Sequence, residues 1–175
     1  NGLANAINSL ISIDGSYEIS VVSFSTTAQT LVNHVLVNSL AARTAVANAI
    51  IADSYTGGST DYAAAFNLMG SILVGGDQTS GLAYVNFATD GVPNSQAAAI
   101  TARNNLISSA GVDNLSIEGI GASADPSFLQ TSICYPGPCD STAPYNFPTQ
   151  GFYIAVADAQ GYADAIGNKI KVVTG

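Results

Sequence analysis

Residues 84–91 read YVNFATDG, an apolar and β-favouring run that stops at a Thr-Asp-Gly turn. A short run of this kind, bounded by a turn signal, is typical of a strand buried inside a sheet, and we place the strand at residues 82–88. An Ala-rich helical segment follows at residues 95–110, and a second apolar strand at residues 115–121. Strand, helix and strand in this order predict two parallel strands joined by a right-handed crossover.

Helices and strands alternate through the rest of the chain as well. Apolar residues recur at helical spacing in residues 2–13, and the two β-rich runs that follow are expected to pair as a hairpin. This order predicts an α/β fold of the Rossmann type, a doubly wound, mostly parallel sheet with helices on both faces and one antiparallel edge strand. With 175 residues and no linker or repeat, residues 1–175 are expected to form a single domain. The other predicted elements are strands at residues 17–25, 29–37 and 152–157, and helices at residues 40–52, 61–73, 126–132 and 159–170.

The composition excludes several classes of partner. Hydrophobic residues make up 47% of the chain and charged residues only 9%, with a net charge of −8. Because an acidic surface repels phosphate backbones and anionic lipids, we expect neither nucleic-acid binding nor membrane insertion, whereas cations are natural partners. No signal peptide or transmembrane segment is visible, and a start at Asn1 rather than Met fits a trimmed or truncated product.

The only two cysteines, Cys134 and Cys139, flank a Tyr-Pro-Gly-Pro turn that can bring their sulfur atoms together. We expect a disulfide, which stabilises a closed loop this short by about 2 kcal/mol, and therefore an oxidising compartment outside the cell or at its surface. The alternatives are two free thiols or a metal-binding pair. A zinc site is disfavoured because it needs four ligands and the lone histidine, His34, is far away in sequence.

Two loops carry oxygen ligands where a ligand site is expected in an open α/β sheet, outside the carboxyl ends of the strands. One is residues 58–61, Gly-Ser-Thr-Asp, which leads into a predicted helix, and the other is residues 88–91, Ala-Thr-Asp-Gly, which follows a predicted strand. Hydroxyl and carboxylate oxygens are the ligands that a hard cation such as Mg²⁺ prefers.

The order of the elements, with these two loops in it, resembles that of the von Willebrand factor A-type (VWA) family over nearly the whole chain. Residues 56–66, TGGSTDYAAAF, resemble the loop that supplies the family's threonine ligand, and YVNFATDG resembles the strand that delivers its aspartate. The resemblance implies a metal-ion-dependent adhesion site (MIDAS) with Thr60 as the threonine and Asp90 as the aspartate, and Ser59 as the rival for the threonine position. The implied cofactor is a divalent cation, Mg²⁺ first and Ca²⁺ or Mn²⁺ as alternatives, whose coordination is completed by an acidic residue of a protein ligand.

One part of the family pattern is missing. The Asp-x-Ser-x-Ser motif should end a central strand just before the first helix, but this chain starts at that helix, and the similar Asp14-Gly15-Ser16 is read as a turn after it. We therefore expect a VWA-like domain that lacks its N-terminal central strand, with unpaired backbone along a gap in the sheet. Either preceding residues or another chain would supply the strand, and without the serine motif no metal is expected to bind.

Structural roles compete with the metal roles at both positions. Asp90 is also suited to capping the next turn, and Thr60 to capping a helix with Asp61 in its first turn. His34 is expected to be a half-buried or surface residue of an edge strand. No nucleophile–base pair stands in a motif context, so the chain is not expected to be an enzyme.

The function that these observations predict is a secreted or cell-surface adhesion module that binds protein, with a divalent metal in its site. The alternative is a structural subunit of a secreted fibre, filament or surface layer, in which copies of the chain bind one another and a neighbour supplies the missing strand. Low charge and a high content of small residues support this alternative.

Overall fold

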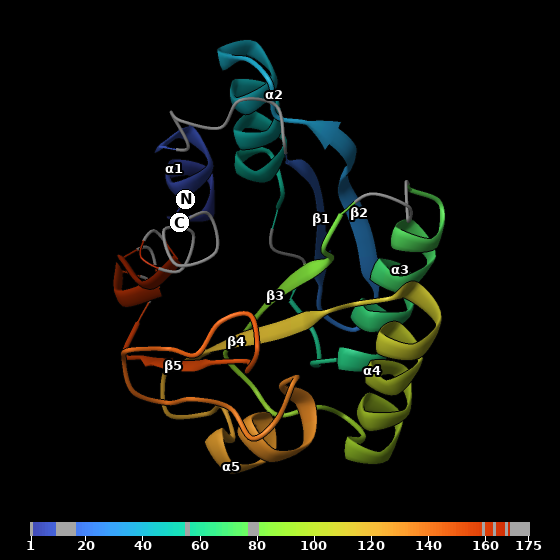
Figure 1. The fold of residues 1–175 in the computed structure, drawn as a ribbon, viewed down its shortest axis with the longest axis vertical. Coiled ribbons are helices and arrows are strands. Elements are labelled where there is room, and N and C mark those ends of the chain that lie inside the picture. The colour runs from blue at the N-terminus through green and yellow to red at the C-terminus, as the bar shows by residue number, and fades with distance from the viewer. Residues whose placement is uncertain are drawn as a thin grey trace.

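The computed structural model describes residues 2–9, 17–54, 57–76 and 81–158, together with residues 160–162, 164–166 and 168. Helices and strands alternate along the described chain as predicted (Figure 1). The elements are α1 (Gly2–Ser9), β1 (Glu18–Phe24), β2 (Ala28–Leu36), α2 (Leu40–Ile51), α3 (Tyr62–Val74), β3 (Tyr84–Thr89), α4 (Gln96–Ala110), β4 (Asn114–Ile120), α5 (Pro126–Phe128), a π-helical turn η1 (Leu129–Ile133) and β5 (Tyr153–Val156).

The strands form two separate sheets. β1 and β2 pair as the predicted antiparallel hairpin, in a register that sets Glu18 opposite Leu36. β3, β4 and β5 form a parallel sheet in that order, with Tyr84 opposite Asn114 and Ile117 opposite Tyr153. Among the described residues no strand lies between β1 and β3. The edge of the hairpin at β1 therefore lies opposite the edge of the parallel sheet at β3, across a gap.

β1 and β3 run in the same direction, because the loops at their carboxyl ends meet. The chain after β1 accepts a hydrogen bond at the carbonyl of Ser25 from the amide of Asp61, 2.8 Å away. The loop after β3 reaches the same place, where the amide of Asn94 donates to the carbonyl of Thr60 over 2.9 Å. All strands except β2 can therefore share one direction, which confirms the prediction of a mostly parallel arrangement with one antiparallel edge strand.

Helices cover both faces of the strands, as a doubly wound fold requires (Figure 1). α3 and α4 pack against each other and, with β3 and β4, enclose a large core that includes Phe66, Phe87 and Leu106. α1 and α2 pack on the other side and, with the hairpin, enclose a smaller core around Val21 and Val46. The two cores have no buried residue in common.

Polar side chains begin the helices. Ser39, Asp61 and Ser95 each accept a hydrogen bond from a backbone amide three residues further on, which satisfies one of the free donors of the first turn. The prediction of Thr60 as a cap is therefore wrong, because Asp61 is the residue that caps α3. α4 ends at Gly111, whose φ of 66° lies in the left-handed region that glycine adopts without strain.

Some predicted boundaries shift. The strand expected at residues 82–88 begins only at Tyr84, and Leu82 is 64% exposed. The short helix expected at residues 126–132 is α5 followed by the π-helical turn. The predicted turn at residues 14–16 lies outside the described residues, as do parts of the helices predicted at residues 2–13 and 159–170.

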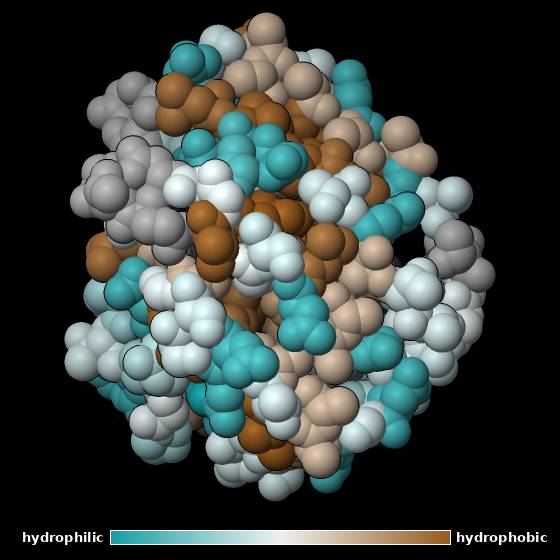
Figure 2. Space-filling model, turned by 90° about the vertical axis from the view of Figure 1, so that its right-hand side faces the viewer, coloured by the Kyte–Doolittle hydropathy of each residue, from teal (hydrophilic) through white to brown (hydrophobic). Residues whose placement is uncertain are grey.

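The surface is weakly charged and partly apolar. Figure 2 shows hydrophobic side chains reaching the surface in several patches, separated by polar ones. None of the described helices has the length and apolar character needed to cross a membrane. The large hydrophobic side chains that are most exposed are Leu36, Leu40, Ile51, Val74, Leu82 and Val92.

Candidate functional site

The two oxygen-bearing loops meet at the carboxyl end of β3. Besides the hydrogen bond from the amide of Asn94 to the carbonyl of Thr60, the Thr60 side chain lies directly against Gly91. A Cβ atom at Gly91 would come within 2.9 Å of Thr60 Oγ1, so only glycine lets the loops approach this closely. Thr60 is thus brought beside the residue that follows Asp90.

Ser59 serves to tie the loops together. Its amide donates to Thr26 Oγ1 over 3.0 Å, and the hydroxyls of the two residues lie 3.3 Å apart. The side-chain amide of Asn94 donates to Ser59 Oγ over 3.0 Å. Since the Ser59 hydroxyl already joins three loops, Thr60 is the better candidate for a cation ligand.

Tyr62, the first residue of α3, holds the loop after β3 in place. Its side chain is buried, and its hydroxyl donates to the carbonyl of Gly91 over 2.5 Å. The pKa of Tyr62 is raised to about 12, chiefly by burial and to a smaller extent by the nearby carboxylates of Asp125 and Asp90, so the hydroxyl keeps its proton and stays a donor. Sequence reasoning missed Tyr62, Thr26 and Asn94, although an aromatic residue in the first turn of a predicted helix is a visible signal.

The carboxylates at this end of the sheet have different roles. Asp90 is exposed, directly after β3. Asp61 caps α3 and Asp125 caps α5, where it accepts from the amide of Phe128 over 3.1 Å. Asp90 is therefore the carboxylate of this group that is exposed and outside a helix cap.

The donors fit a hard divalent cation in kind. A threonine hydroxyl and an aspartate carboxylate carried by adjoining loops are ligands that Mg²⁺ accepts together with water. They do not suffice in number, since the described residues contain no group of three His, Cys, Asp or Glu placed to hold a metal. Thr60 and Asp90 could hold part of a coordination shell and would need further ligands to complete it.

The disulfide loop lies at the other end of the sheet. Cys134 and Cys139 are bonded, with Cα atoms 6.1 Å apart, and Tyr135 pairs with Leu115 at the start of β4. Arg103 of α4 fastens this region, because its guanidinium donates to the carbonyls of Ile133 and Cys134 over 2.8 and 2.7 Å. The loop is therefore a second surface, separate from the site at Asp90.

His34 also lies far from the site, near the start of β1. One ring nitrogen contacts the carboxylate of Glu18, and the other donates to the carbonyl of Ile72 over 2.7 Å. These two acceptors raise the pKa of His34, and the hydrogen bond that the ring donates to Glu18 has the larger effect. The half-buried histidine thus joins the hairpin to α3, and it provides no base to the hydroxyls at the carboxyl ends.

No family model matches the chain, and no curated protein does. Solved structures match it closely in fold. Proximal thread matrix protein 1 from the mussel byssus superposes with a TM-score of 0.68 at 15% identity, over 98% of this chain and 39% of that one. A form of the same protein with a zinc-occupied MIDAS motif gives a TM-score of 0.69 at 16% identity, over 98% and 41% of the two chains.

The manganese-loaded TRAP protein of Plasmodium vivax has a TM-score of 0.65 at 23% identity, over 94% of this chain and 62% of that one. The chain thus spans about two fifths of the mussel protein and less than two thirds of the Plasmodium protein. Both neighbours contain VWA domains, and their superposition covers nearly the whole chain. The predicted fold is confirmed: the described part of the chain has an α/β fold of the von Willebrand factor A type.

Proposed function

We propose that this chain is an extracellular protein-binding module of the adhesion type, which uses a divalent cation held in part by Thr60 and Asp90. The bound cation, Mg²⁺ in the first place, takes an acidic residue of the protein ligand as its last ligand. The module acts by binding and not by catalysis. The remaining cation ligands come from an Asp-x-Ser-x-Ser segment outside these 175 residues.

The observation that carries the proposal is the contact of the Thr60 side chain with Gly91, next to the exposed Asp90. Three further groups hold this contact in place, the hydroxyl of Tyr62, the side chain of Asn94 and the hydroxyl of Thr26. A site built on fixed loops at the carboxyl ends of strands positions its ligands before the cation arrives. The zinc- and manganese-loaded neighbours support a divalent cation at such a site.

Two observations support the extracellular location. The Cys134–Cys139 disulfide is of the kind that persists in oxidising compartments. The mussel protein with this fold comes from the byssus, which supports a place outside the cell for this chain as well.

The test is a calorimetric titration with Mn²⁺ of two proteins, the 175-residue chain and the same chain carrying an apolar strand that ends in Asp-x-Ser-x-Ser before Asn1. We expect the second protein to bind Mn²⁺ at least about tenfold more tightly. In that background Asp90→Ala and Thr60→Ala should each weaken binding by about tenfold or more, and Ser59→Ala by less.

Asp164→Ala is the matched control, because Asp164 is exposed on the last helical segment, where it accepts a hydrogen bond from Gln160 of that segment. It should leave Mn²⁺ affinity unchanged. Equal affinity in the Asp90→Ala and parent proteins would show that the loops are structural and that the proposed site does not exist.

The second candidate function is a structural subunit of a secreted fibre or surface layer. The low charge and the match to a thread matrix protein favour it. Light scattering after size-exclusion chromatography, over a range of protein concentrations, distinguishes the two. Reversible growth beyond a monomer supports the structural role, and a monomer at every concentration excludes self-assembly by this chain.

A further inference from the structure

Asp90 differs from the other described aspartates in how its carboxylate is held. The carboxylate of each of the others accepts a hydrogen bond from a backbone amide or from a nearby side chain, and these residues are Asp53, Asp61, Asp113, Asp125, Asp140, Asp158 and Asp164. Within the described part of the chain, the carboxylate of Asp90 accepts no such bond, and the residue is exposed. This carboxylate can therefore turn towards its own main chain.

Glycine follows Asp90, and it follows no other aspartate that the structure describes. An aspartate isomerises when the amide nitrogen of the next residue attacks its side-chain carboxyl carbon, and a Cβ atom on that next residue hinders the approach. Gly91 has no Cβ, and the hydrogen bond from its amide to Thr89 Oγ1 is long, at 3.4 Å. Neither of the two reacting groups is therefore held firmly away from the other.

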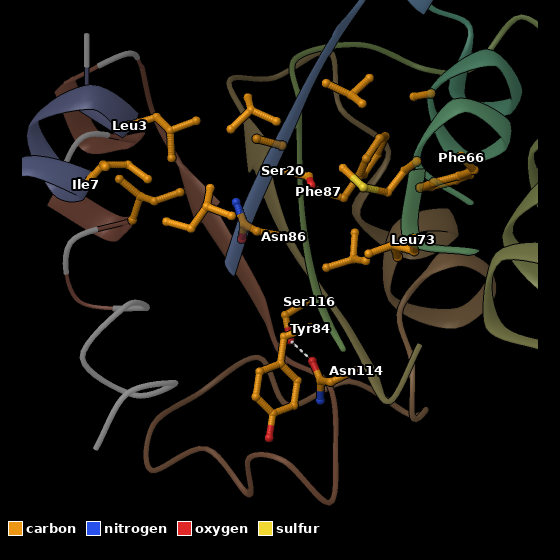
Figure 3. Close-up of a pocket in the computed structure, with 18 of the residues that line it drawn as sticks. Leu3, Ile7, Ser20, Phe66, Leu73, Tyr84, Asn86, Phe87, Asn114 and Ser116 are labelled. Carbon is orange, nitrogen blue, oxygen red and sulfur yellow. Dashed lines mark hydrogen bonds between the residues drawn. The ribbon is translucent and has the colours of Figure 1, made fainter. Parts of the chain in front are cut away.

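The fold requires the glycine at this position. A Cβ atom at residue 91 would slow the attack, but it would come within 2.9 Å of Thr60 Oγ1. The close approach of the two loops, which the cavity-facing strands do not share (Figure 3), depends on that missing side chain. The same contact that brings Thr60 beside the loop after β3 thus keeps a chemically labile Asp-Gly pair at the surface.

We propose that the bond between Asp90 and Gly91 is a site of spontaneous isoaspartate formation in the folded protein. The Gly91 nitrogen loses its proton and bonds to Cγ of Asp90, and one carboxyl oxygen leaves as water, which closes a succinimide ring. One water then adds to the ring and opens it. Where the bond from the Asp90 main-chain carbonyl carbon to nitrogen breaks, the main chain runs through Cβ and Cγ and the former main-chain carbonyl becomes the free carboxylate. The water released equals the water consumed, so no co-reactant is needed.

The product has one more carbon in its main chain, between two points that are fixed. Thr89 is buried in β3 opposite Gly119, and the carbonyl of Gly91 accepts the hydrogen bond from Tyr62. The free carboxylate of the product is bonded directly to Cα and no longer ends a side chain. Its displacement abolishes cation binding, a consequence that rests on the proposed function, whereas the isomerisation itself does not depend on any metal.

The test incubates the 175-residue chain at neutral pH with EDTA, below its melting temperature, and samples it over several weeks. Endoproteinase Asp-N cleaves before aspartate and not before isoaspartate, so mass spectrometry detects isomerisation at residue 90 as an uncut peptide. Isoaspartyl methyltransferase measures the total isoaspartate independently. We expect conversion at Asp90 to be at least about tenfold faster than at any other described aspartate, because none of those precedes glycine.

The same chain unfolded in urea shows whether the folded loop permits the reaction. An exposed loop opens locally at little cost in free energy, so the rate at Asp90 in the folded chain should lie within about tenfold of the rate in urea. This comparison separates a reaction of the folded protein from one that needs global unfolding.

A matched pair of variants tests the chemistry without a steric clash. Thr60→Ala removes the hydroxyl that a Cβ at residue 91 would meet and leaves the Cβ of residue 60 at 3.7 Å, an ordinary contact. Gly91 is not among the described glycines with positive φ, so alanine is not strained there. Isoaspartate at residue 90 should form at least about tenfold more slowly in Thr60→Ala/Gly91→Ala than in Thr60→Ala. Circular dichroism checks that both fold, and if the double variant does not, the other two comparisons decide.

Conversion at Asp90 no faster than at Asp53 or Asp140, which serine follows, overturns the proposal. So does a folded rate more than about tenfold below the rate in urea, or an equal rate in the two variants. Mn²⁺ added to the strand-bearing protein should slow the conversion, because a coordinated carboxylate is not free to react. Conversion that Mn²⁺ leaves unchanged would contradict the proposed function and would still establish the isomerisation.

Discussion

Phe24 of β1 stacks on Phe87 of β3, with ring centroids 5.3 Å apart and 17° between the ring planes. The two rings belong to strands of different sheets, and no described strand lies between them. Phe87 also contacts Tyr62 edge-on at 4.8 Å, so the stack continues to the residue that anchors the loop after β3. This aromatic contact holds the carboxyl ends of the two sheets together next to the candidate site.

Phe24→Ala should therefore destabilise the protein. Removing a large aromatic side chain from a core costs about 3–5 kcal/mol, and we expect the lower end of that range because Phe24 is only partly buried. Urea unfolding followed by circular dichroism measures the free energy of unfolding. Val92→Ala, at a side chain that is 53% exposed, should change it by less than about 0.5 kcal/mol. A loss at Phe24 no larger than that at Val92 would mean that the stack does not hold the sheets together.

The pairing of His34 with Glu18 makes stability depend on pH. Because the folded state raises the pKa of His34, folding favours the protonated ring, and its contribution to stability is complete below the ordinary pKa of about 6.5. The contribution is lost as the pH rises from there through the higher pKa of the folded state. The melting temperature, measured at closely spaced pH values from 5 to about 9, should fall over this window.

His34→Asn should remove that fall. Asparagine tolerates the left-handed backbone at this position, where φ is 50°, so the substitution changes the charge without straining the chain. Glu18→Gln should weaken the dependence, because it removes the main cause of the raised pKa. If His34→Asn keeps the full pH dependence of the parent's melting temperature, that dependence comes from other titratable groups.

Arg103 holds the disulfide loop through the carbonyls of Ile133 and Cys134 and lies over the ring of Tyr135, 5.2 Å from its centroid. Arg103→Ala leaves these partly buried carbonyls without their donor and should cost about 2 kcal/mol. Arg103→Lys should recover only part of this loss, because lysine lacks the planar fork. Differential scanning calorimetry measures both, and Asn105→Ala, at an exposed position of the same helix, should leave the melting temperature nearly unchanged. If Arg103→Lys has the full stability of the parent, the positive charge alone is enough and the planar guanidinium is not required.

Asp61 and Thr60 should separate into a stability role and a binding role. Asp61→Ala removes the cap of α3, which costs about 1 kcal/mol, whereas Thr60→Ala should cost less than about half of that. Chemical unfolding of both variants without metal gives the comparison. If Thr60→Ala proves the more destabilising of the two, the Thr60 hydroxyl is part of the fold and not a reserved ligand.

The sequence predicts most of the fold because its signals are local. The apolar run that becomes β3 and the Ala-rich helix α4 each follow from neighbouring residues. The sequence does not distinguish Thr60 from Asp61 as the cap of α3, because either side chain can accept a hydrogen bond from the first turn. The two choices differ by one residue in where the helix begins.

Other features depend on residues far apart in the chain, which local patterns do not report. Tyr62 binds Gly91 and Arg103 binds Cys134 across separations of 29 and 31 residues. Glu118 is fully buried in the middle of β4, where a strand pattern predicts an apolar residue. The pKa of Tyr162 is raised mainly by the burial of that tyrosine, and the charge of Glu118 is the second cause. Contacts of this kind form only once the crossovers have brought distant segments together.

The most direct measurement for the binding site is an anomalous difference map from crystals of the strand-bearing protein grown with Mn²⁺. The account predicts one strong peak at the carboxyl end of β3, in direct or single-water contact with Thr60 Oγ1 and the Asp90 carboxylate. A peak elsewhere on the molecule, with none beside Thr60 and Asp90, would contradict it.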